Sequence, residues 1–81
     1  MTAPHRTTFS FDYVDADRAR LVERAIRQEV DEIADDRSWT TVTRNGATLQ
    51  VVVAAEDLVA LRAGMNTWLT LTDVAERAAE R

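Results

Sequence analysis

The feature that most constrains the fold is residues 54–79, which carry the longest helical periodicity in the chain. At about 100° per residue, two neighbouring stripes of this helix are apolar or small. The larger residues are Leu58, Leu61, Met65, Trp68, Thr72 and Ala75, and the smaller ones are Ala60, Gly64, Thr67, Leu71, Val74 and Ala78. An apolar surface this wide needs more than one neighbouring helix or sheet to bury it. We expect the larger residues to lie on a sheet and the smaller ones to face another helix.

The sequence leaves the identity of that other helix open. A glycine in mid-helix costs about 1 kcal/mol relative to alanine, so Gly64 is consistent with a close approach at its position. One alternative is the chain's own first helix, and the other is a helix of a partner protein. In the second case, the docking surface would comprise Leu21, Ala25, Ala60, Gly64, Thr67, Leu71 and Val74.

The N-terminal half predicts a strand followed by a helix. Residues 6–14 alternate, with Phe9, Phe11 and Tyr13 on one face, which is typical of a half-buried strand. Asp15 is a suitable N-cap for a helix that runs from residue 16 to about 34 and ends at Asp35-Asp36. The outer face of this helix carries a row of arginines that is either a solvated face or a contact for RNA phosphates: Arg20, Arg24 and Arg27.

A hairpin is predicted between residues 38–44 and 47–54. The Asn45-Gly46 pair between two β-rich runs favours a type I′ turn, with Val42 opposite Leu49. The helix-covered face would then hold Val42, Leu49, Val51 and Val53, and the open face Trp39, Thr41, Thr43, Gln50 and Val52. A bulge that turns Trp39 inward is the alternative.

Together these elements predict one domain, residues 1–81, of the α+β class with the order strand, helix, strand, strand, helix. The third strand is the most apolar, so we place it at the centre of a three-stranded antiparallel sheet. Both helices would cover one face in a two-layer sandwich. The element order is similar to that of KH modules, although their GXXG clamp is absent.

Catalysis, metal binding and cofactor binding are not expected. The chain has no cysteine, and its single histidine, His5, falls in a predicted N-terminal tail. Gly46 and Gly64 are its only glycines, so no glycine-rich phosphate loop can form. Glu56 and Asp57 suit the first turn of the last helix, where carboxylates complement the helix dipole.

Charge and hydropathy limit the partners. The formal net charge is −4 and every basic residue except His5 is arginine, a composition similar to that of salt-adapted proteins. A negative total disfavours free-standing nucleic-acid binding, which rests on phosphate neutralisation. No apolar run is long enough to span a membrane, so a soluble cytoplasmic protein is expected. A chain of 81 residues has a small core, which favours oligomerisation.

Residues 49–69 resemble the Pcc family, the small dimer-forming subunit of the KEOPS complex. The most specific part is A-x-x-D followed by A-L-R-A-x-x-N, with motif residues Asp57, Leu61, Arg62, Ala63 and Asn66. The turn at 36–38 and the N-terminal F-x-F-x-Y also fit the family. The lysine-free, acidic composition would fit a haloarchaeal member.

The resemblance implies a non-catalytic, cofactor-free scaffold that homodimerises and docks its helices on the Kae-type threonylcarbamoyltransferase subunit. The assembled complex makes threonylcarbamoyl-adenosine in tRNA, so Arg37 and Arg62 become candidate tRNA contacts. Dimerisation would use either the strand edges or the open sheet face, with candidates Trp39, Thr41, Gln50 and Val52. A stand-alone KH-like RNA-binding module and a small-ligand regulatory domain of the ACT type are the alternative functions.

Overall fold

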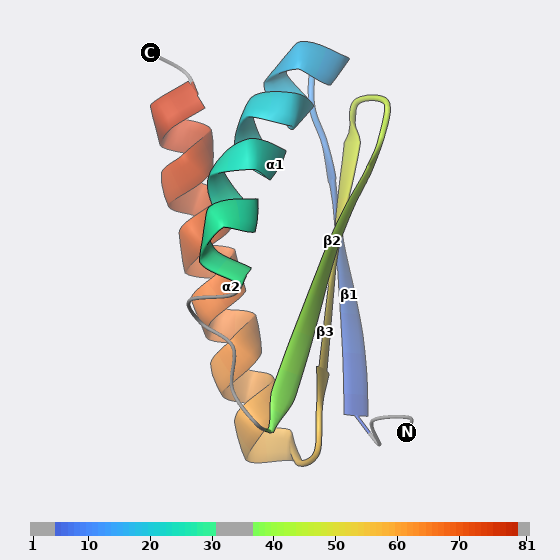
Figure 1. Ribbon diagram of the computed structural model, residues 1–81, viewed down its shortest axis with the longest axis vertical. Coiled ribbons are helices and arrows are strands. Elements are labelled where there is room, and N and C mark those ends of the chain that lie inside the picture. The colour runs from blue at the N-terminus through green and yellow to red at the C-terminus, as the bar shows by residue number, and fades with distance from the viewer. Residues whose placement is uncertain (1–4, 31–36, 80–81) are drawn as a thin grey trace.

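A computed structural model of the protein describes residues 5–30 and 37–79. The elements follow the order β1 (His5–Asp12), α1 (Ala16–Val30), β2 (Ser38–Asn45), β3 (Thr48–Ala55) and α2 (Leu58–Ala79). The three strands form an antiparallel sheet in the order β1-β3-β2, and both helices cover one face of it (Figure 1). This architecture confirms the predicted α+β sandwich with the most apolar strand at its centre.

The beginning of β1 corrects one prediction. His5 lies in the strand, opposite Ala55 of β3, and not in a tail. The predicted N-cap of α1 is confirmed, because the Asp15 Oδ1 accepts a hydrogen bond of 2.8 Å from the Arg18 backbone N–H. The predicted end of the first helix at Asp35-Asp36 lies outside the described residues.

The beginning of α2 is four residues later than predicted, at Leu58 in place of residue 54. Ala54 and Ala55 pair with both neighbouring strands, so sheet hydrogen bonding overrides their helix propensity. Asp57 precedes the helix as its N-cap, and its Oδ1 accepts a hydrogen bond of 2.8 Å from the Ala60 N–H. The prediction that Glu56 and Asp57 occupy the first helical turn is therefore wrong.

The hairpin turn also differs from the prediction. Asn45 pairs with Thr48, so the loop is Gly46-Ala47, and Val42 lies opposite Val51 rather than Leu49. Gly46 has a φ of 64°, and no other described residue has a positive φ. A positive φ at the first loop residue alone matches a type II′ turn, not type I′. The pairing partner moves by two residues, an even number, so every side chain keeps its predicted face.

The core lies between the sheet and the two helices. The side of β3 that faces the helices, Leu49, Val51, Val53 and Ala55, has no exposed surface. From the helices, Val22, Ile26, Trp68 and Ala75 belong to the same core cluster, and Ala19 and Thr72 are buried as well. The predicted stripe of larger α2 residues is confirmed for Trp68, Thr72 and Ala75, which are buried, and for Leu61, which packs against the core, whereas Leu58, at 57 % exposed, does not belong to it.

Candidate interaction surfaces

The first candidate surface is the outer side of the helix pair. The helices α1 and α2 lie side by side, with α1 along the C-terminal part of α2 (Figure 1). Leu21 is 51 % exposed and Val74 is 58 % exposed, and Ala25 is exposed as well. Ala60, Thr67 and Leu71 are partly buried, and Leu71 contacts the core. The predicted docking residues thus divide into an exposed set, Leu21, Ala25 and Val74, and a half-buried set.

Gly64 does not belong to this docking surface. A Cβ atom at Gly64 would come within 2.9 Å of the Val53 Cγ1 atom, which belongs to the fully buried face of β3. The close approach that this glycine permits is therefore between α2 and the chain's own sheet. Neither of the two predicted neighbours, the first helix or a partner helix, accounts for it.

Three further apolar side chains of α2 are exposed and were not predicted as surface residues. They are Leu58 at 57 %, Val59 at 73 % and Leu69 at 41 %. Leu58 and Leu69 are three helical turns apart and lie on the same side of α2, given about 3.6 residues per turn. Helical periodicity alone could not place them, because which side of α2 remains uncovered depends on where α1 and β1 lie.

The second candidate surface is the sheet face opposite the helices. Trp39 is 51 % exposed there, so the outward alternative is confirmed and the inward bulge is wrong. Thr41, Thr43 and Gln50 are exposed, and Val52 is partly buried. The structure adds four residues of β1 that sequence reasoning did not single out as site candidates, Arg6, Thr8, Ser10 and Asp12, all of them exposed.

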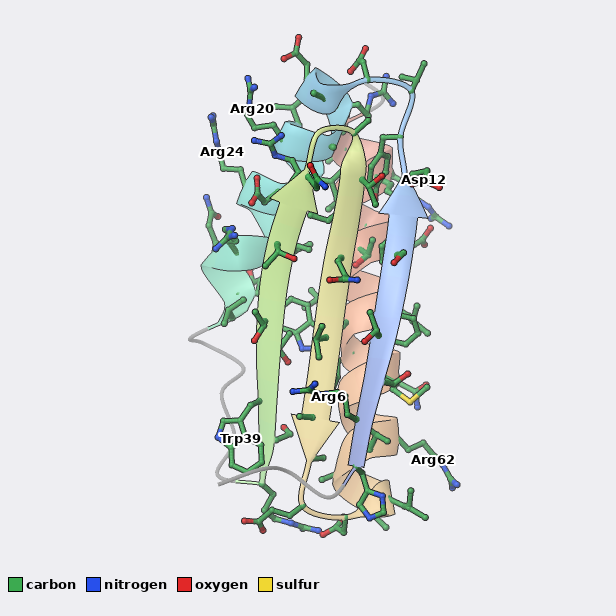
Figure 2. The ribbon with its side chains drawn as sticks, turned by 90° about the vertical axis from the view of Figure 1, so that its right-hand side faces the viewer. Arg6, Asp12, Arg20, Arg24, Trp39 and Arg62 are labelled. Carbon is green, nitrogen blue, oxygen red and sulfur yellow. The ribbon has the colours of Figure 1, made fainter. Side chains whose placement is uncertain are left out.

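Charge on the open face is confined to opposite ends of β1. Arg6 lies at the same end of the face as Trp39, and Asp12 lies at the other end (Figure 2). The Thr48 hydroxyl donates a hydrogen bond of 2.8 Å to the Asp12 Oδ1. Among residues 5–30 and 37–79, Arg6 has no hydrogen-bond or ion-pair partner. One end of the open face is therefore positive and the other negative.

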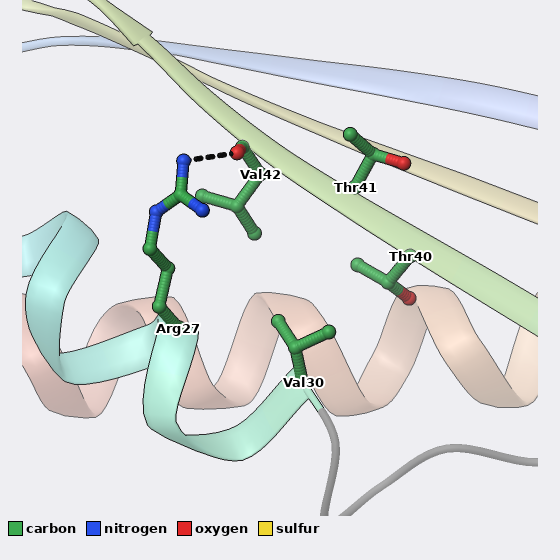
Figure 3. A pocket seen from close by; sticks show the side chains of 5 residues that line it. All are labelled: Arg27, Val30, Thr40, Thr41 and Val42. Carbon is green, nitrogen blue, oxygen red and sulfur yellow. Dashed lines mark hydrogen bonds between the residues drawn. The ribbon is translucent and has the colours of Figure 1, made fainter.

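The outer edge of β2 is occupied by side chains of α1. The Arg27 Nη2 donates a hydrogen bond of 2.6 Å to the Val42 carbonyl, at the rim of a hollow lined by Val30 and Thr40 (Figure 3). Glu23 accepts hydrogen bonds from Arg27 at 3.0 Å and from Arg44 at 2.9 Å. Partial burial opposes ionisation of Glu23, but the two guanidinium groups outweigh it and lower the pKa of this carboxyl group. An incoming strand would meet Arg27 at this edge.

At the opposite side of the sheet, the chain following β1 is fixed to α2. The Tyr13 hydroxyl donates a hydrogen bond of 2.7 Å to the Glu76 Oε2. Burial and this negatively charged acceptor both raise the pKa of the Tyr13 phenol. The interaction positions the aromatic side of β1 beneath the C-terminal half of α2.

The arginines divide into paired and unpaired side chains. Arg37 forms an ion pair with Asp57, and Arg20 forms one with Asp17 at 3.3 Å. Within the described part of the chain, Arg24 and Arg62 have no ion-pair partner, and both project into solvent (Figure 2). Of the two predicted tRNA contacts, Arg62 is therefore unpaired and Arg37 is engaged at the N-terminus of α2.

The residues of the motif that resembles the Pcc family divide into a structural group and an exposed group. Asp57 caps α2 and Leu61 packs on the core, which gives both a structural role. The remaining motif residues, Arg62, Ala63 and Asn66, are exposed on the outer side of α2. The motif therefore defines how α2 begins and also contributes to the surface that α2 presents.

Residues 6–80 match the family model described as "Transcription factor Pcc1". The chain belongs to the Pcc1 family. Members of this family are subunits of the KEOPS complex, which functions in tRNA modification. The match extends over nearly all of the sequence and confirms the membership predicted from residues 49–69. A search of curated proteins found no significant match.

No helix within residues 5–30 and 37–79 is long and apolar enough to cross a membrane. The same residues contain no group of three or more histidine, aspartate or glutamate side chains arranged to hold a metal ion.

Proposed function

We propose that this Pcc1-family protein is the non-catalytic dimerisation and scaffold subunit of a KEOPS assembly, acting in the cytoplasm of a salt-adapted archaeon. The observation that carries the proposal is the presence of two candidate surfaces on opposite sides of the sandwich. If the open sheet face binds a second copy, the helix pair of each copy remains free. A dimer of this kind can therefore bridge two copies of the assembly.

In this proposal the helix pair docks the Kae-type threonylcarbamoyltransferase subunit. An exposed, uncharged patch is supplied by Leu21, Ala25 and Val74. Patches without charged residues are typical of the core of a protein interface. The half-buried residues Ala60, Thr67 and Leu71 would form its base. The threonylcarbamoyl chemistry, ATP and metal ions belong to other subunits, so no cofactor is assigned to this chain.

The contribution to tRNA binding is proposed to be indirect and to require the assembled complex. A formal net charge of −4 opposes binding of the isolated subunit to a polyanion. Arg62 and Arg24 are exposed and have no ion-pair partner within residues 5–30 and 37–79, which supports contact with phosphates once a partner orients the subunit. Arg37 supports the surface in a different way, because its ion pair with Asp57 fixes the start of α2.

Co-purification with the transferase subunit tests the docking surface. Val74→Asp should abolish co-elution, because it places a charge in an apolar interface, while the isolated variant should remain folded and dimeric. The matched control is Val59→Asp, another exposed valine of α2 that lies about four helical turns from Val74, which should co-elute normally. If Val74→Asp co-elutes as well as the wild type, the transferase does not bind this side of the helix pair.

A gel shift separates the scaffold from a stand-alone RNA-binding module. The isolated subunit should bind tRNA only weakly at physiological ionic strength, and addition of the transferase subunit should strengthen binding. Tight binding by the isolated subunit, reversed by Arg62→Glu, would instead favour a KH-like RNA-binding function.

A further inference from the structure

We propose that Asn45-Gly46, at the tip of the hairpin between β2 and β3, is a self-modification site at which the Asn45 amide is converted to a carboxylate. The only co-reactant is water, and the product changes the charge of the open sheet face. Asn45 and Gly46 are both exposed, so water reaches the reacting atoms. Gly46 has a φ of 64° and begins the two-residue loop that follows β2.

The reaction is an intramolecular attack followed by hydrolysis. The Gly46 backbone nitrogen loses its proton to water or hydroxide and bonds to the Asn45 Cγ atom. The side-chain nitrogen leaves with the electron pair of its C–N bond, takes up a proton and departs as ammonia. The cyclic imide that results then adds a water molecule. Hydrolysis at Cγ gives aspartate, whereas hydrolysis at the main-chain carbonyl gives isoaspartate, in which the chain continues through the side chain.

The surroundings of Gly46 leave the attacking nitrogen accessible. Glycine has no side chain to obstruct the approach of Cγ, and within residues 5–30 and 37–79 the Gly46 N–H donates no hydrogen bond. The Arg44 Nη1 donates a hydrogen bond of 3.1 Å to the Gly46 carbonyl. This positive charge beside the loop favours the loss of a proton from the Gly46 nitrogen, because that ionisation creates a negative charge.

The strand pairing slows the reaction without preventing it. Asn45 is extended and pairs with Thr48, so its backbone must rotate about ψ before the Gly46 nitrogen can approach Cγ. That pair is the last of the ladder between β2 and β3, and it can open while the rest of the hairpin stays closed. We expect the folded chain to react about tenfold more slowly than the unfolded chain, which corresponds to about 1.4 kcal/mol for opening the pair.

The other asparagine of the chain, Asn66, provides an internal comparison. It is exposed like Asn45, but it lies within α2 and is followed by Thr67. The nitrogen of Thr67 belongs to a β-branched residue, which obstructs the approach of Cγ. In a helix, that nitrogen also donates a hydrogen bond to the carbonyl four residues earlier. Exposure alone therefore does not decide which asparagine reacts, and we expect Asn45 to be converted in preference to Asn66.

Conversion of Asn45 alters the negative end of the open face. Asp12, Thr48 and Asn45 form one row across the sheet, and the Thr48 hydroxyl donates a hydrogen bond to Asp12. A carboxylate at residue 45 places a second negative charge on the other side of Thr48. Isoaspartate also adds a methylene group to the main chain within the Asn45–Thr48 pair, so the pair can no longer close in register. Each product should weaken dimerisation through this face, a consequence that rests on the proposed function.

Peptide mass spectrometry of the stored protein tests the modification. Cleavage after arginine separates the two asparagines, with Asn45 in residues 45–62 and Asn66 in residues 63–77. After storage at mildly alkaline pH, the first peptide should gain the mass difference between an amide and a carboxylate, assigned by fragmentation to residue 45 and not to Gln50. The second peptide should keep its mass. Urea should accelerate the gain about tenfold, and mild acid should suppress it, because the attacking nitrogen must lose a proton. A digest of freshly prepared protein controls for conversion during digestion.

Two results of this experiment would overturn the proposal. If the folded protein keeps its mass while the chain unfolded in urea is converted, the hairpin holds Asn45 in a conformation that cannot react. If Asn45 and Asn66 gain mass equally, the conversion is ordinary hydrolysis of exposed amides, and the Asn45-Gly46 site has no special reactivity.

Asn45→Asp, which copies the aspartate product, tests the consequence for the open face. Sedimentation should show a loss of dimer affinity for this variant, whereas Asn66→Asp on α2, the matched control, should dimerise like the wild type. An Asn45→Asp variant with unchanged affinity would overturn the consequence for the face. A fresh wild type that is monomeric would refute the dimerisation in the proposed function, but the mass measurement needs no dimer and tests the modification independently.

Discussion

The two faces of β3 show how one strand serves two purposes. On the helix side, Leu49, Val51 and Val53 have no exposed surface, whereas on the open side Gln50 is exposed and Val52 is only partly buried. The residues alternate along the strand, so both sets have the same backbone pairing. The difference between the faces therefore comes from the side chains and from what covers them, and not from the sheet itself.

This difference indicates how the molecule divides stability from association. The covered face excludes water and supplies most of the hydrophobic free energy of folding. The open face is rich in threonine, a good strand former that keeps the uncovered sheet polar. We expect substitutions on the covered face to alter the free energy of unfolding, and those on the open face to alter dimer affinity.

The largest expected effect comes from comparing the two tryptophans, one on each face. Trp68 is 3 % exposed in the core, and Trp39 is 51 % exposed on the open face. Trp68→Ala should lower the free energy of unfolding by about 3–5 kcal/mol, through lost burial and a residual cavity. Trp39→Ala should cost the monomer less than about 1 kcal/mol, in the range of surface substitutions, yet weaken the dimer.

Denaturant unfolding across a range of protein concentrations separates these terms, because dimer dissociation makes apparent stability concentration-dependent. Trp68→Phe is a milder variant should Trp68→Ala fail to fold. Equal losses of monomer stability at Trp68 and Trp39 would show that the two faces do not differ in the way proposed.

Gly64→Leu should have the next largest effect, and it tests the contact beneath α2. The side chain would collide with Val53, whose branched side chain is fully buried and has little freedom to move. We expect a loss of about 1–3 kcal/mol from overpacking. Ala63→Leu is the matched control, because Ala63 directly precedes Gly64 in the same helix and its side chain is exposed. A Gly64→Leu variant that melts like the wild type would contradict the contact.

A smaller effect of opposite sign is expected at Thr72. Its side chain is 2 % exposed, and within the described residues its hydroxyl has no hydrogen-bond partner. Thr72→Val keeps the shape and removes the unsatisfied group, so stability should rise by about 1 kcal/mol. Thr70→Val, at an exposed position of the same helix, should leave stability nearly unchanged. A destabilised Thr72→Val variant would indicate that the hydroxyl is hydrogen-bonded in solution.

The sequence was sufficient to predict which face of the sheet each side chain occupies. It was not sufficient to predict the hairpin turn, the pairing register of β2 and β3, or the residue at which α2 begins. Alternation in β2 and β3 placed Val42 inward and Trp39 outward, because side-chain period depends only on strand geometry. The predicted turn type was wrong because the segment Asn45-Gly46-Ala47 is compatible with two types of two-residue hairpin loop. Gly at the second loop position suits type I′, and Gly at the first suits type II′. Pairing of all three strands, which is non-local, determines the choice.

For the candidate surfaces, the sequence predicted which positions are apolar but not which neighbour they face. Periodicity along α2 separated apolar from polar positions, but it could not say whether Gly64 faced a helix or the sheet. That depends on the lateral position of α1, which the sequence pattern does not contain. Arg6 and Asp12 were not predicted as site residues, because their location at opposite ends of one face emerges only once the strand register is known.

The smallest expected effect is at Glu23, where the covered side of the sandwich reaches the edge of β2. Arg27 and Arg44 both donate to its carboxylate, and together they lower its pKa. A carboxyl group with a lower pKa in the folded state stabilises the fold above its unfolded pKa of about 4.3, and this stabilisation is lost as the pH falls through the folded pKa. Glu23→Gln should therefore cost a few tenths to about 1 kcal/mol at pH 7, the range for ion pairs near a surface. The difference from the wild type should shrink below about pH 4.

Asp17→Asn is the control, because the Asp17–Arg20 pair is much more exposed, with side chains at 87 % and 51 %. Urea unfolding at several pH values measures both variants. A Glu23→Gln cost that persists unchanged in acid would mean that the side chain acts by packing and not through its charge.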